Sequence, residues 1–506
     1  MSPDQTYDVV IIGSGLGGLL SAVILAKEGM KVCVLEKDKQ IGGCLQTFSF
    51  QKTVFDSCVH YIGGLGEGHT LNKIFQYAGI MDKLKLKSFD ENGFDRIVLN
   101  EDDLSYPLAV GFNNFVEQLI PYFPKEREDL EGYIKVLTTV GDHFPLYRLR
   151  LGSPDEKAII AGWSLTETLS NITQNRKLQN VLAGNNLLYA GEKDVSPFYL
   201  HALVSESYIH SAHKVVPGSS EIAKHLWREL LSLGGTIYRN TEIVELVERN
   251  GRLEYAESLG GQRFYGRQFI ANIHPNALFR ILESKLIRPA YRKRLLGIRQ
   301  TTSAFMVNLV LNPGTVPFRD YNIYWHAHED VWRAVKYLPE EWPLNYALYF
   351  TGSQRHEGYA ESLSILTYMH YDEVKQWADT SNHSGHEEDR GPDYEVFKQK
   401  RAELLLEKVY RRLPELRGNI IAASSATPLT YRDYTATPEG ALYGTLKDVR
   451  KPAETTVSTR TRIPNLLLTG QNVNLHGVLG VSITAIATCA ELIGMEYLLN
   501  NINKQG

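Results

Sequence analysis

The stretch that most constrains this chain is Asp8–Glu36, which reads DVVIIGSGLGGLLSAVILAKEGMKVCVLE. It opens with residues 9–12, a short β-branched run of the kind found in strands that are buried on both faces. Glycines then follow in G-x-G-x-x-G spacing, a helical segment comes next, and residues 31–35 form a second strand candidate. This order of strand, glycine turn, helix and strand predicts a dinucleotide-binding unit.

The glycines of this turn have separate roles in binding a pyrophosphate. Gly13 allows the tight turn, Gly15 lets the backbone approach the phosphates, and Gly18 lets the helix pack closely on the strand. The N-terminus of the helix points its free N–H groups and partial positive charge at the phosphates. We therefore expect Leu16 and Gly17, which lie in the same turn, to contact the cofactor as well.

An acidic residue ends the second strand. Glu36 lies 18 residues after Gly18, near the spacing of about 20 expected for the carboxylate that accepts from a ribose hydroxyl. Its negative charge disfavours a 2′-phosphate at this position. We place Glu36 and the adjacent Lys37 at the ribose, and both NAD and FAD fit a unit of this kind.

Two further glycine segments favour FAD. Gly42 and Gly43 follow the acid after five residues and give the backbone a second close approach to the cofactor. Near the C-terminus, a strand predicted at 463–468 leads into a glycine segment and an apolar helix from about residue 481. Two such units at opposite ends of a chain predict one long cofactor that is held from both ends, the second contributing Gly470, Gln471, Gly480 and Val481.

The chain of 506 residues is too long for one simple core. We predict an α/β fold in which a Rossmann-type, doubly wound parallel sheet carries an inserted α+β substrate-binding lobe. Amphipathic helices are expected at 112–123, 126–140 and 159–169, and strands at 303–311, 321–325, 344–350 and 362–368. The predicted division is a cofactor domain formed by 1–80, 206–300 and 451–506, a helical part of the lobe at 81–205 and a sheet part at 301–450.

Composition narrows the function classes. A formal net charge of −4 gives no reason to expect a nucleic-acid partner. The four cysteines lack metal-ligand spacing and fit a reducing compartment, and we expect Cys44 and Cys58 to be small core residues, although either is near enough to the motifs to reach a flavin. A signal peptide and an 18-residue apolar run are both missing from the sequence, which predicts a cytoplasmic, unsecreted protein with contact to a membrane surface left open.

Polar residues near the glycine motifs are the candidates for chemistry. His60 and Tyr61 follow a predicted hairpin, while Tyr443 and His476 flank the C-terminal glycine segment. Each is a candidate proton donor, with a structural hydrogen-bonding role as the alternative. The histidines and acids of residues 380–392 are expected to form a solvated loop, so no metal site is predicted.

Taken together, the motifs resemble the phytoene desaturase-like flavoproteins, and within them the carotenoid isomerase and retinol saturase branch. The resemblance spans nearly the whole chain and includes HYIGG at 60–64, the Pro217-Gly218 turn, TPLT at 427–430, GALYG at 440–444, and Gly470-Gln471 with Gly477 and Gly480. It implies a non-covalent FAD, a hydrophobic polyene or isoprenoid substrate, and association with a membrane surface. It also implies that the backbone of Val244 lies near the adenine.

The chain departs from that pattern at several positions. Cys44 stands where many desaturases and amine oxidases carry an arginine, and Cys58 stands where the saturase and isomerase pattern has a glycine. Asn472 replaces a common aspartate. These departures leave three reactions open on the same flavin: saturation of a carbon–carbon double bond, which we favour, desaturation, and cis–trans isomerisation.

Rival functions come from other classes. One is a flavin amine oxidase or a protoporphyrinogen oxidase-like enzyme, and another is a lipid carrier that keeps its dinucleotide only for structure. A second dinucleotide fold is not visible in the sequence, so electrons would come from a quinone, an electron carrier, or a nicotinamide that meets the flavin transiently. The oligomeric state is not predicted.

Overall fold

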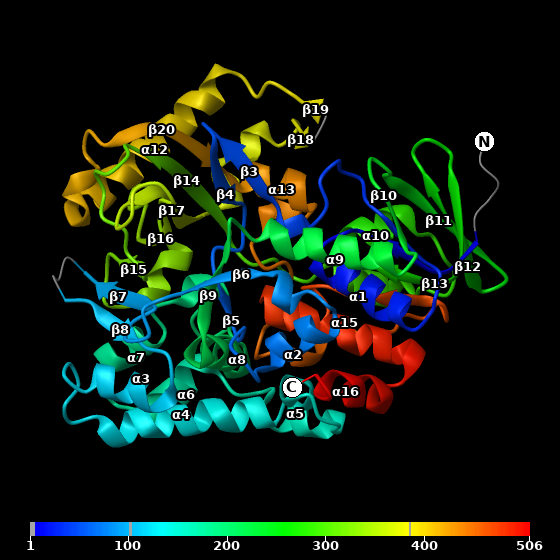
Figure 1. Ribbon diagram of the computed structural model, residues 1–506, viewed down its shortest axis with the longest axis horizontal. Coiled ribbons are helices and arrows are strands. Elements are labelled where there is room, and N and C mark those ends of the chain that lie inside the picture. The colour runs from blue at the N-terminus through cyan, green and yellow to red at the C-terminus, as the bar shows by residue number, and fades with distance from the viewer. Residues whose placement is uncertain (1–5, 101–103, 384–385, 506) are drawn as a thin grey trace.

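The computed structural model describes residues 6–100, 104–383 and 386–505. Two seven-stranded sheets dominate it, and a three-stranded sheet of order β5-β9-β6 lies between them (Figure 1). The first described strand and the C-terminal helices both belong to the region around the first sheet (Figure 1).

The first sheet has the order β10-β2-β1-β13-β12-β11, with β21 also paired to β13. Strands β10, β2, β1, β13 and β21 pair in parallel. Strands β11 and β12 form an antiparallel extension on the N-terminal part of β13. The α/β prediction is confirmed, with this hairpin added to the parallel sheet. The strands are β1 (Thr6–Ile12), β2 (Val32–Leu35), β10 (Thr236–Tyr238), β11 (Ile243–Arg249), β12 (Arg252–Ser258), β13 (Arg263–Ala271) and β21 (Leu466–Leu468).

Alternate residues of the central strands are buried on opposite faces. Val9 and Ile11 of β1 pack in the core that contains α1, whereas Val10 and Ile12 pack in a second core with Leu278 of α10. Because both faces are covered, these strands consist almost entirely of apolar residues, as the sequence indicated. The covering helices are α1 (Leu16–Lys27), α9 (Ser220–Ser232) and α15 (Gly477–Ile493) on one side, and α10 (Pro275–Ile281) and α11 (Pro289–Leu296) on the other.

The second sheet has the order β20-β14-β17-β16-β15-β7-β8 and is antiparallel except for the pairing of β15 with β7. Strand β14, the second from one edge, is buried at all nine positions. The strands are β7 (Asp95–Leu99), β8 (Tyr106–Leu108), β14 (Ser303–Leu311), β15 (Asn322–His326), β16 (Asn345–Gly352), β17 (Ala360–Met369) and β20 (Ile420–Ala426).

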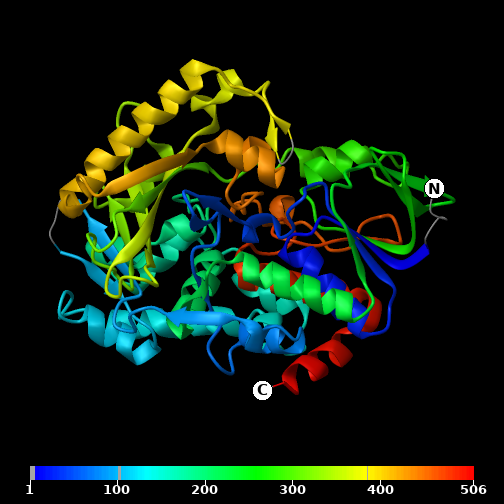
Figure 2. The ribbon, with the colours of Figure 1, turned by 45° about the horizontal axis from the view of Figure 1, so that its top comes forward.

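Helices enclose this sheet from two sides (Figure 2). The long helix α12 (Pro392–Arg412) lies at the outer edge, and a group of shorter helices lies below the sheet in the view of Figure 1. These shorter helices are α3 (Phe112–Leu119), α4 (Arg127–Asp142), α5 (Pro154–Ile160), α6 (Leu165–Ile172), α7 (Arg176–Leu182) and α8 (Phe198–His210).

The remaining elements connect these parts. In the view of Figure 1, the hairpin of β3 and β4 lies above helices α1, α9 and α15. Helix α13 lies against β14 and β20. The elements are β3 (Thr47–Phe50), β4 (Thr53–Asp56), β5 (Ile62–Gly63), β6 (Lys85–Ser88), β9 (Ala212–Val216), β18 (Asn382–His383), β19 (His386–Glu387), α2 (Thr70–Tyr77), α13 (Pro428–Thr435), α14 (Pro452–Thr455) and α16 (Met495–Asn503).

Several predicted boundaries are wrong for local reasons. The helix predicted at 159–169 is two helices, because Ser164 caps the second one through a hydrogen bond from the backbone N–H of Glu167. The helix predicted at 112–123 ends at Leu119, ahead of Pro121. The segment 81–205, expected to be helical, also contributes strands β6, β7 and β8.

At the C-terminal unit, the strand predicted at 463–468 spans only the last three of those residues. Pro464 has no N–H to donate to a neighbouring strand. The helix begins at Gly477, four residues earlier than predicted. Across residues 6–100, 104–383 and 386–505, no helix combines the length and the apolar character needed to span a bilayer.

Candidate functional site

A cavity of about 450 Å³ lies where β1, β2, β13 and β21 of the first sheet end. We call it the glycine cavity. Ligands of open parallel sheets bind at this edge, outside the carboxyl ends of the strands. Its lining includes Gly13, Ser14, Gly15, Leu16, Gly17, Glu36, Lys37, Asp38, Gly42, Gly43, Thr241, Ile243, Asn272, Gly470, Gln471, Asn472 and Val481.

The glycine turn is packed too closely to admit side chains. A Cβ atom added at Gly18 would lie 2.2 Å from the carbonyl oxygen of Gly13, so α1 and β1 touch through their backbones. Gly470 has a φ of +94°, and an added Cβ there would lie 2.7 Å from Oδ1 of Asn272. The floor of the cavity is therefore bare backbone contributed by both ends of the chain.

Asn272 fills the space between the two glycine segments. It directly follows β13, and its Nδ2 donates to the carbonyl oxygen of Gly13 at 3.3 Å. Our sequence analysis missed this residue. The available signal was its position at the end of a strand that is parallel to β1.

Glu36 is held rigidly at one end of the cavity. Its Oε2 accepts from the backbone N–H of Ser14 at 2.9 Å and from the Ser14 hydroxyl at 2.5 Å, and its Oε1 accepts from the N–H of Asp38 at 3.0 Å. The residue is only 7% exposed. A carboxylate fixed in this way, beside a helix N-terminus, suits a ribose hydroxyl next to a pyrophosphate.

Most predicted cofactor residues lie at this cavity. Gly18 lies beneath the turn without lining the cavity, and Gly480 lines the adjoining cavity described below. Val244 lines neither cavity, and its side chain is 38% exposed, whereas its neighbour Ile243 lines the glycine cavity. A β-bulge between Ile243 and Glu245 turns the Val244 side chain outward.

A second cavity of about 120 Å³ adjoins the first. We call it the tyrosine cavity. The two share Cys58, Val59, His60, Leu366, Tyr443, Gly477 and Val478 as lining residues. Its other walls are mainly apolar or aromatic: Tyr61, Ile62, Tyr147, Leu188, Leu203, Val204, Tyr208, Tyr349 and Leu479.

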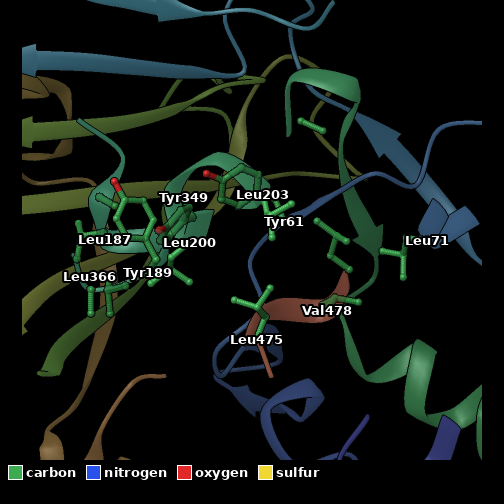
Figure 3. Packing of buried hydrophobic residues seen from close by; sticks show 14 of the residues in the cluster. Tyr61, Leu71, Leu187, Tyr189, Leu200, Leu203, Tyr349, Leu366, Leu475 and Val478 are labelled. Atoms are coloured by element: carbon green, nitrogen blue, oxygen red, sulfur yellow. The ribbon is translucent and has the colours of Figure 1, made fainter. Parts of the chain in front are cut away.

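Figure 3 shows how distant segments build this region. Tyr349 of β16 and Leu366 of β17 lie close to Leu200 of α8, while Leu475 and Val478 approach from the C-terminal segment. All five belong to one continuous hydrophobic cluster. Water is therefore poorly accommodated along these walls, which suits an apolar ligand.

The structure brings all four predicted catalytic candidates to the tyrosine cavity. Three of them have their polar atoms engaged in structural hydrogen bonds. Tyr61 donates to Asp95, Tyr443 donates to the carbonyl oxygen of Leu187 at 2.8 Å, and Nε2 of His476 donates to a backbone carbonyl at 3.1 Å. The rings of Tyr443 and His476 are 4.2 Å apart.

His60 differs from the other three. Its ring stacks on Tyr349, with centroids 4.3 Å apart, and its buried Nε2 has no hydrogen-bond partner among the described residues. Burial, together with the nearby charge of Lys214, lowers the pKa of His60 to about 3. The imidazole is therefore neutral at physiological pH and offers a free ring nitrogen at the boundary of the two cavities.

A buried carboxyl group lies behind the cavity wall. Asp95 is fully buried, and its Oδ2 accepts from the Tyr61 hydroxyl at 2.8 Å. Tyr61 lies 2.6 Å from the hydroxyl of Tyr324, which is 3.3 Å from that of Tyr349. Four groups thus form one chain of hydrogen bonds that ends at a residue of the cavity wall.

Two amides complete the surroundings of Asp95. Asn322 donates to Oδ1 at 2.9 Å, and Asn185 donates to Oδ2 at 3.3 Å. Desolvation outweighs these hydrogen bonds and raises the pKa of Asp95 to about 7. No local pattern in the sequence marks this group, because Asp95 and Asn322 become neighbours only through the pairing of β7 with β15.

The expectation that Cys44 and Cys58 are core residues is wrong. Both are half-buried, and both line the glycine cavity. Within the described ranges, no group of three or more His, Cys, Asp or Glu residues is arranged to hold a metal ion. The side chains of residues 383–387, part of the loop expected at 380–392, lie outside the described residues.

The chain is similar to known proteins both in a local segment and over most of its length. A family model described as an NAD(P)-binding Rossmann-like domain matches residues 11–78. The human all-trans-retinol 13,14-reductase is 28% identical over 98% of this chain and 87% of its own length. Prolycopene isomerase 1 of an Oncidium hybrid cultivar is 24% identical over 87% of this chain and 75% of its own length.

Among solved structures, a putrescine oxidase redesigned in its cofactor binding matches with a TM-score of 0.65 at 15% identity, covering 97% of this chain and 99% of its own. At that identity the match shows the fold alone. The retinol 13,14-reductases instead match 97–99% of this chain at 27–28% identity. The chain is thus similar over nearly its whole length to retinol 13,14-reductases and over most of its length to prolycopene isomerases, which supports the phytoene desaturase-like branch.

Proposed function

We propose that this protein is an FAD-dependent oxidoreductase that saturates a carbon–carbon double bond of a hydrophobic polyene of the retinoid or carotenoid type. The observation that carries the proposal is the wall shared by the glycine cavity and the tyrosine cavity, with His60, Leu366 and Tyr443 on both. A dinucleotide in one cavity meets an apolar ligand in the other only across this wall. The relatives named as a retinol reductase and a prolycopene isomerase support the substrate class.

The residues of the glycine cavity suit the parts of FAD in order. Gly13, Gly15 and Gly17, with the N-terminus of α1, would hold the pyrophosphate. Glu36, next to Lys37, would accept from the ribose. Gly42 and Gly43 would lie along the phosphates, the backbone at Val244 near the adenine, and Gly470, Gln471, Gly480 and Val481 on the flavin side.

When bound, FAD supplies the redox chemistry, a hydride exchanged at N5. The protein then has three tasks: to orient the polyene, to exclude water and to deliver a proton to the second carbon. The apolar and aromatic lining of the tyrosine cavity serves the first two.

The chain from Asp95 to Tyr349 suits the third task. With Asp95 ionised, Tyr61 donates to Asp95, Tyr324 donates to Tyr61, and Tyr349 donates to Tyr324. With Asp95 protonated, its hydroxyl would donate to Tyr61 and every hydroxyl in the chain would point the opposite way, toward the cavity wall. Reversal of the chain moves one proton from the buried acid to the cavity wall, and we assign the terminal position, the Tyr349 hydroxyl, as the donor.

His60 has a different role in this proposal. A neutral imidazole is a poor general acid near pH 7, so His60 would position the ligand through its free Nε2. Tyr443 and His476 would position the wall segments to which they are bound. Tyr61 serves as the relay between Asp95 and Tyr324.

Isomerisation of a polyene is the second candidate, favoured by the relatives named prolycopene isomerase, which match 87% of this chain. The electron donor would be a quinone, an electron carrier or a transient nicotinamide. Because polyenes are poorly soluble, delivery from a membrane surface to a protein on the cytoplasmic side accompanies either reaction in this proposal.

Spectroscopy tests the proposal directly. The purified protein should show oxidised-flavin absorbance that bleaches on anaerobic reduction. Adding an all-trans polyene should restore that absorbance while the polyene band shifts to the blue, as expected for a shortened conjugated system. An unchanged chromophore length with altered geometry indicates an isomerase, and peroxide formation with amines or porphyrinogens indicates the oxidase alternative. A protein that binds no flavin even after reconstitution would overturn the proposal.

A further inference from the structure

Two cysteines flank the open end of the β3–β4 hairpin. The hairpin pairs Thr47 with Asp56, and the backbone N–H of Ser57 donates to the carbonyl oxygen of Gln46 at 3.1 Å, extending the pairing by one step. Cys58 directly follows Ser57, and Cys44 lies two residues before Gln46, in the short helical turn Gly43–Leu45. The hairpin therefore places the two cysteines on neighbouring chain segments.

Their exposure sets this pair apart from the other cysteines. Cys44 and Cys58 are half-buried and open into the glycine cavity, and Cys58 also lines the tyrosine cavity. Cys33 is buried among the strands of the first sheet, and Cys489 is buried with its thiol donating to the carbonyl oxygen of Ser21. The two thiols of the pair are thus the two that a cofactor or a small reductant can reach.

The thiols also act on one another. A hydrogen bond between the two side chains lowers the pKa of Cys44 and, together with desolvation, raises the pKa of Cys58. This is the asymmetry of a reactive dithiol, in which one sulfur is stabilised as the attacking thiolate by the other.

We infer that Cys44 and Cys58 form a reversible disulfide facing the glycine cavity and exchange two electrons with the flavin. The inference rests on the proposed binding of FAD. When the disulfide forms, the two S–H bonds break and one S–S bond is made. This releases two electrons and two protons, which reduce the oxidised flavin. An external dithiol then reopens the disulfide by thiol exchange and leaves as its own disulfide.

The electron balance closes over one cycle. One dithiol is oxidised to a disulfide, and one double bond of the polyene gains two hydrogens. The sequence shows no second nucleotide fold that would bind a nicotinamide as the reductant. The cysteine pair would supply the reducing equivalents instead. A dithiol used in turnover need not persist as a disulfide, so the pair is compatible with a reducing compartment.

The first test counts thiols and needs neither flavin turnover nor a polyene. Mild oxidation of the native protein with diamide should reduce the four free thiols to two. Peptide mapping after alkylation should find Cys44 joined to Cys58, with Cys33 and Cys489 still alkylated as internal controls. Cys44→Ser and Cys58→Ser should each retain three thiols, and four thiols remaining in the oxidised wild type would overturn the inference.

The second test measures electron transfer in the flavin-loaded protein. Under anaerobic conditions dithiothreitol should bleach the oxidised-flavin absorbance about tenfold faster in the wild type than in Cys58→Ser. Cys58→Gly, which restores the residue of the related pattern, should match Cys58→Ser. Equal bleaching rates in a protein that forms the disulfide would overturn the exchange with the flavin. Failure to bind flavin would instead overturn the proposed function, so the two failures are distinguishable.

Discussion

The two cavities of this molecule are built in opposite ways. The glycine cavity is formed by backbone from short motifs at the ends of parallel strands, such as the turn between β1 and α1. The tyrosine cavity is formed by side chains from distant segments, and the hydrogen bond between Tyr61 and Tyr324 spans 263 positions of the sequence. The first depends on the absence of side chains, whereas the second depends on the identity of each one.

The largest effect should come from placing a side chain in the first cavity's floor. Gly18→Ala would put a Cβ 2.2 Å from the carbonyl oxygen of Gly13, which neither α1 nor β1 can avoid without separating. We expect a loss of about 3 kcal/mol in the free energy of unfolding and loss of FAD. Flavin absorbance after gel filtration and thermal unfolding measure the two effects.

Gly132→Ala in α4 is the matched control for that substitution. An added Cβ at Gly132 meets nothing within 4 Å, and alanine favours the helix by about 1 kcal/mol relative to glycine. This variant should keep its FAD and gain slightly in stability. Full flavin retention by Gly18→Ala would show that the glycine cavity depends less on bare backbone than the geometry indicates.

This contrast explains how far sequence reasoning reached. The spacing of Gly13, Gly15 and Gly18 and the acid at Glu36 fix a local geometry, so the sheet and most of the cavity lining could be predicted. His60, Tyr61, Tyr443 and His476 were placed near the cofactor by their proximity to glycine motifs, and they do line one cavity. Their catalytic roles remain predictions.

The pairing of distant strands could not be predicted from the sequence. Asp95 and Asn322 meet because β7 pairs with β15, and no periodicity within either strand encodes that choice. Asn272 was missed although its strand was predicted, because an asparagine after a strand is also common turn chemistry. The exposure of Cys44 and Cys58 was misjudged because a small apolar residue near a motif fits a core and a cavity wall equally well.

The next prediction concerns the buried acid and its pH-dependent effect on stability. The pKa of Asp95 is raised from 3.8 to about 7, so the folded state binds the proton more tightly than the unfolded state. Its contribution to stability is intact below pH 3.8 and is lost progressively as the pH rises to about 7. The full loss is about 4 kcal/mol.

The measurement is urea unfolding of wild type and Asp95→Asn between pH 4 and pH 8. The stability of Asp95→Asn relative to wild type should increase with pH across this window, since the amide never ionises. Tyr61, Tyr208, Tyr324 and Tyr349 face this carboxyl group and stay neutral throughout, because burial raises the pKa of each. Asp90→Asn, a partly exposed carboxylate paired with Arg96, controls for the loss of a negative charge. A relative stability that does not vary with pH would contradict the assignment.

A smaller effect should follow from removing the last hydroxyl of the chain. Tyr349→Phe keeps the ring stacked on His60 and deletes only the group that ends the chain from Asp95. We expect kcat for polyene reduction to fall about 100-fold, with KM little changed. Stopped-flow oxidation of the reduced flavin by the polyene measures this step.

Tyr208→Phe is the matched control within the same cavity. Its hydroxyl donates to the backbone carbonyl of Tyr61 at 3.3 Å and is not part of the chain. This variant should keep kcat within about twofold of the wild type. Equal losses in Tyr208→Phe and Tyr349→Phe would mean that the cavity requires packing and polarity in general rather than a directed proton path.

The smallest effect is expected where a predicted cofactor residue turns its side chain away. Val244 is 38% exposed because of the bulge in β11, so only its backbone is available to the adenine. Val244→Ala should therefore change FAD affinity by less than about twofold, whereas Ile243→Ala removes a buried part of the cavity wall and should cost about 3 kcal/mol of stability. Titration of the apoprotein with FAD compares the two variants. If Val244→Ala were the weaker binder, a side chain would matter at the adenine end, and the division between a backbone-built cavity and a side-chain-built cavity would have to be redrawn there.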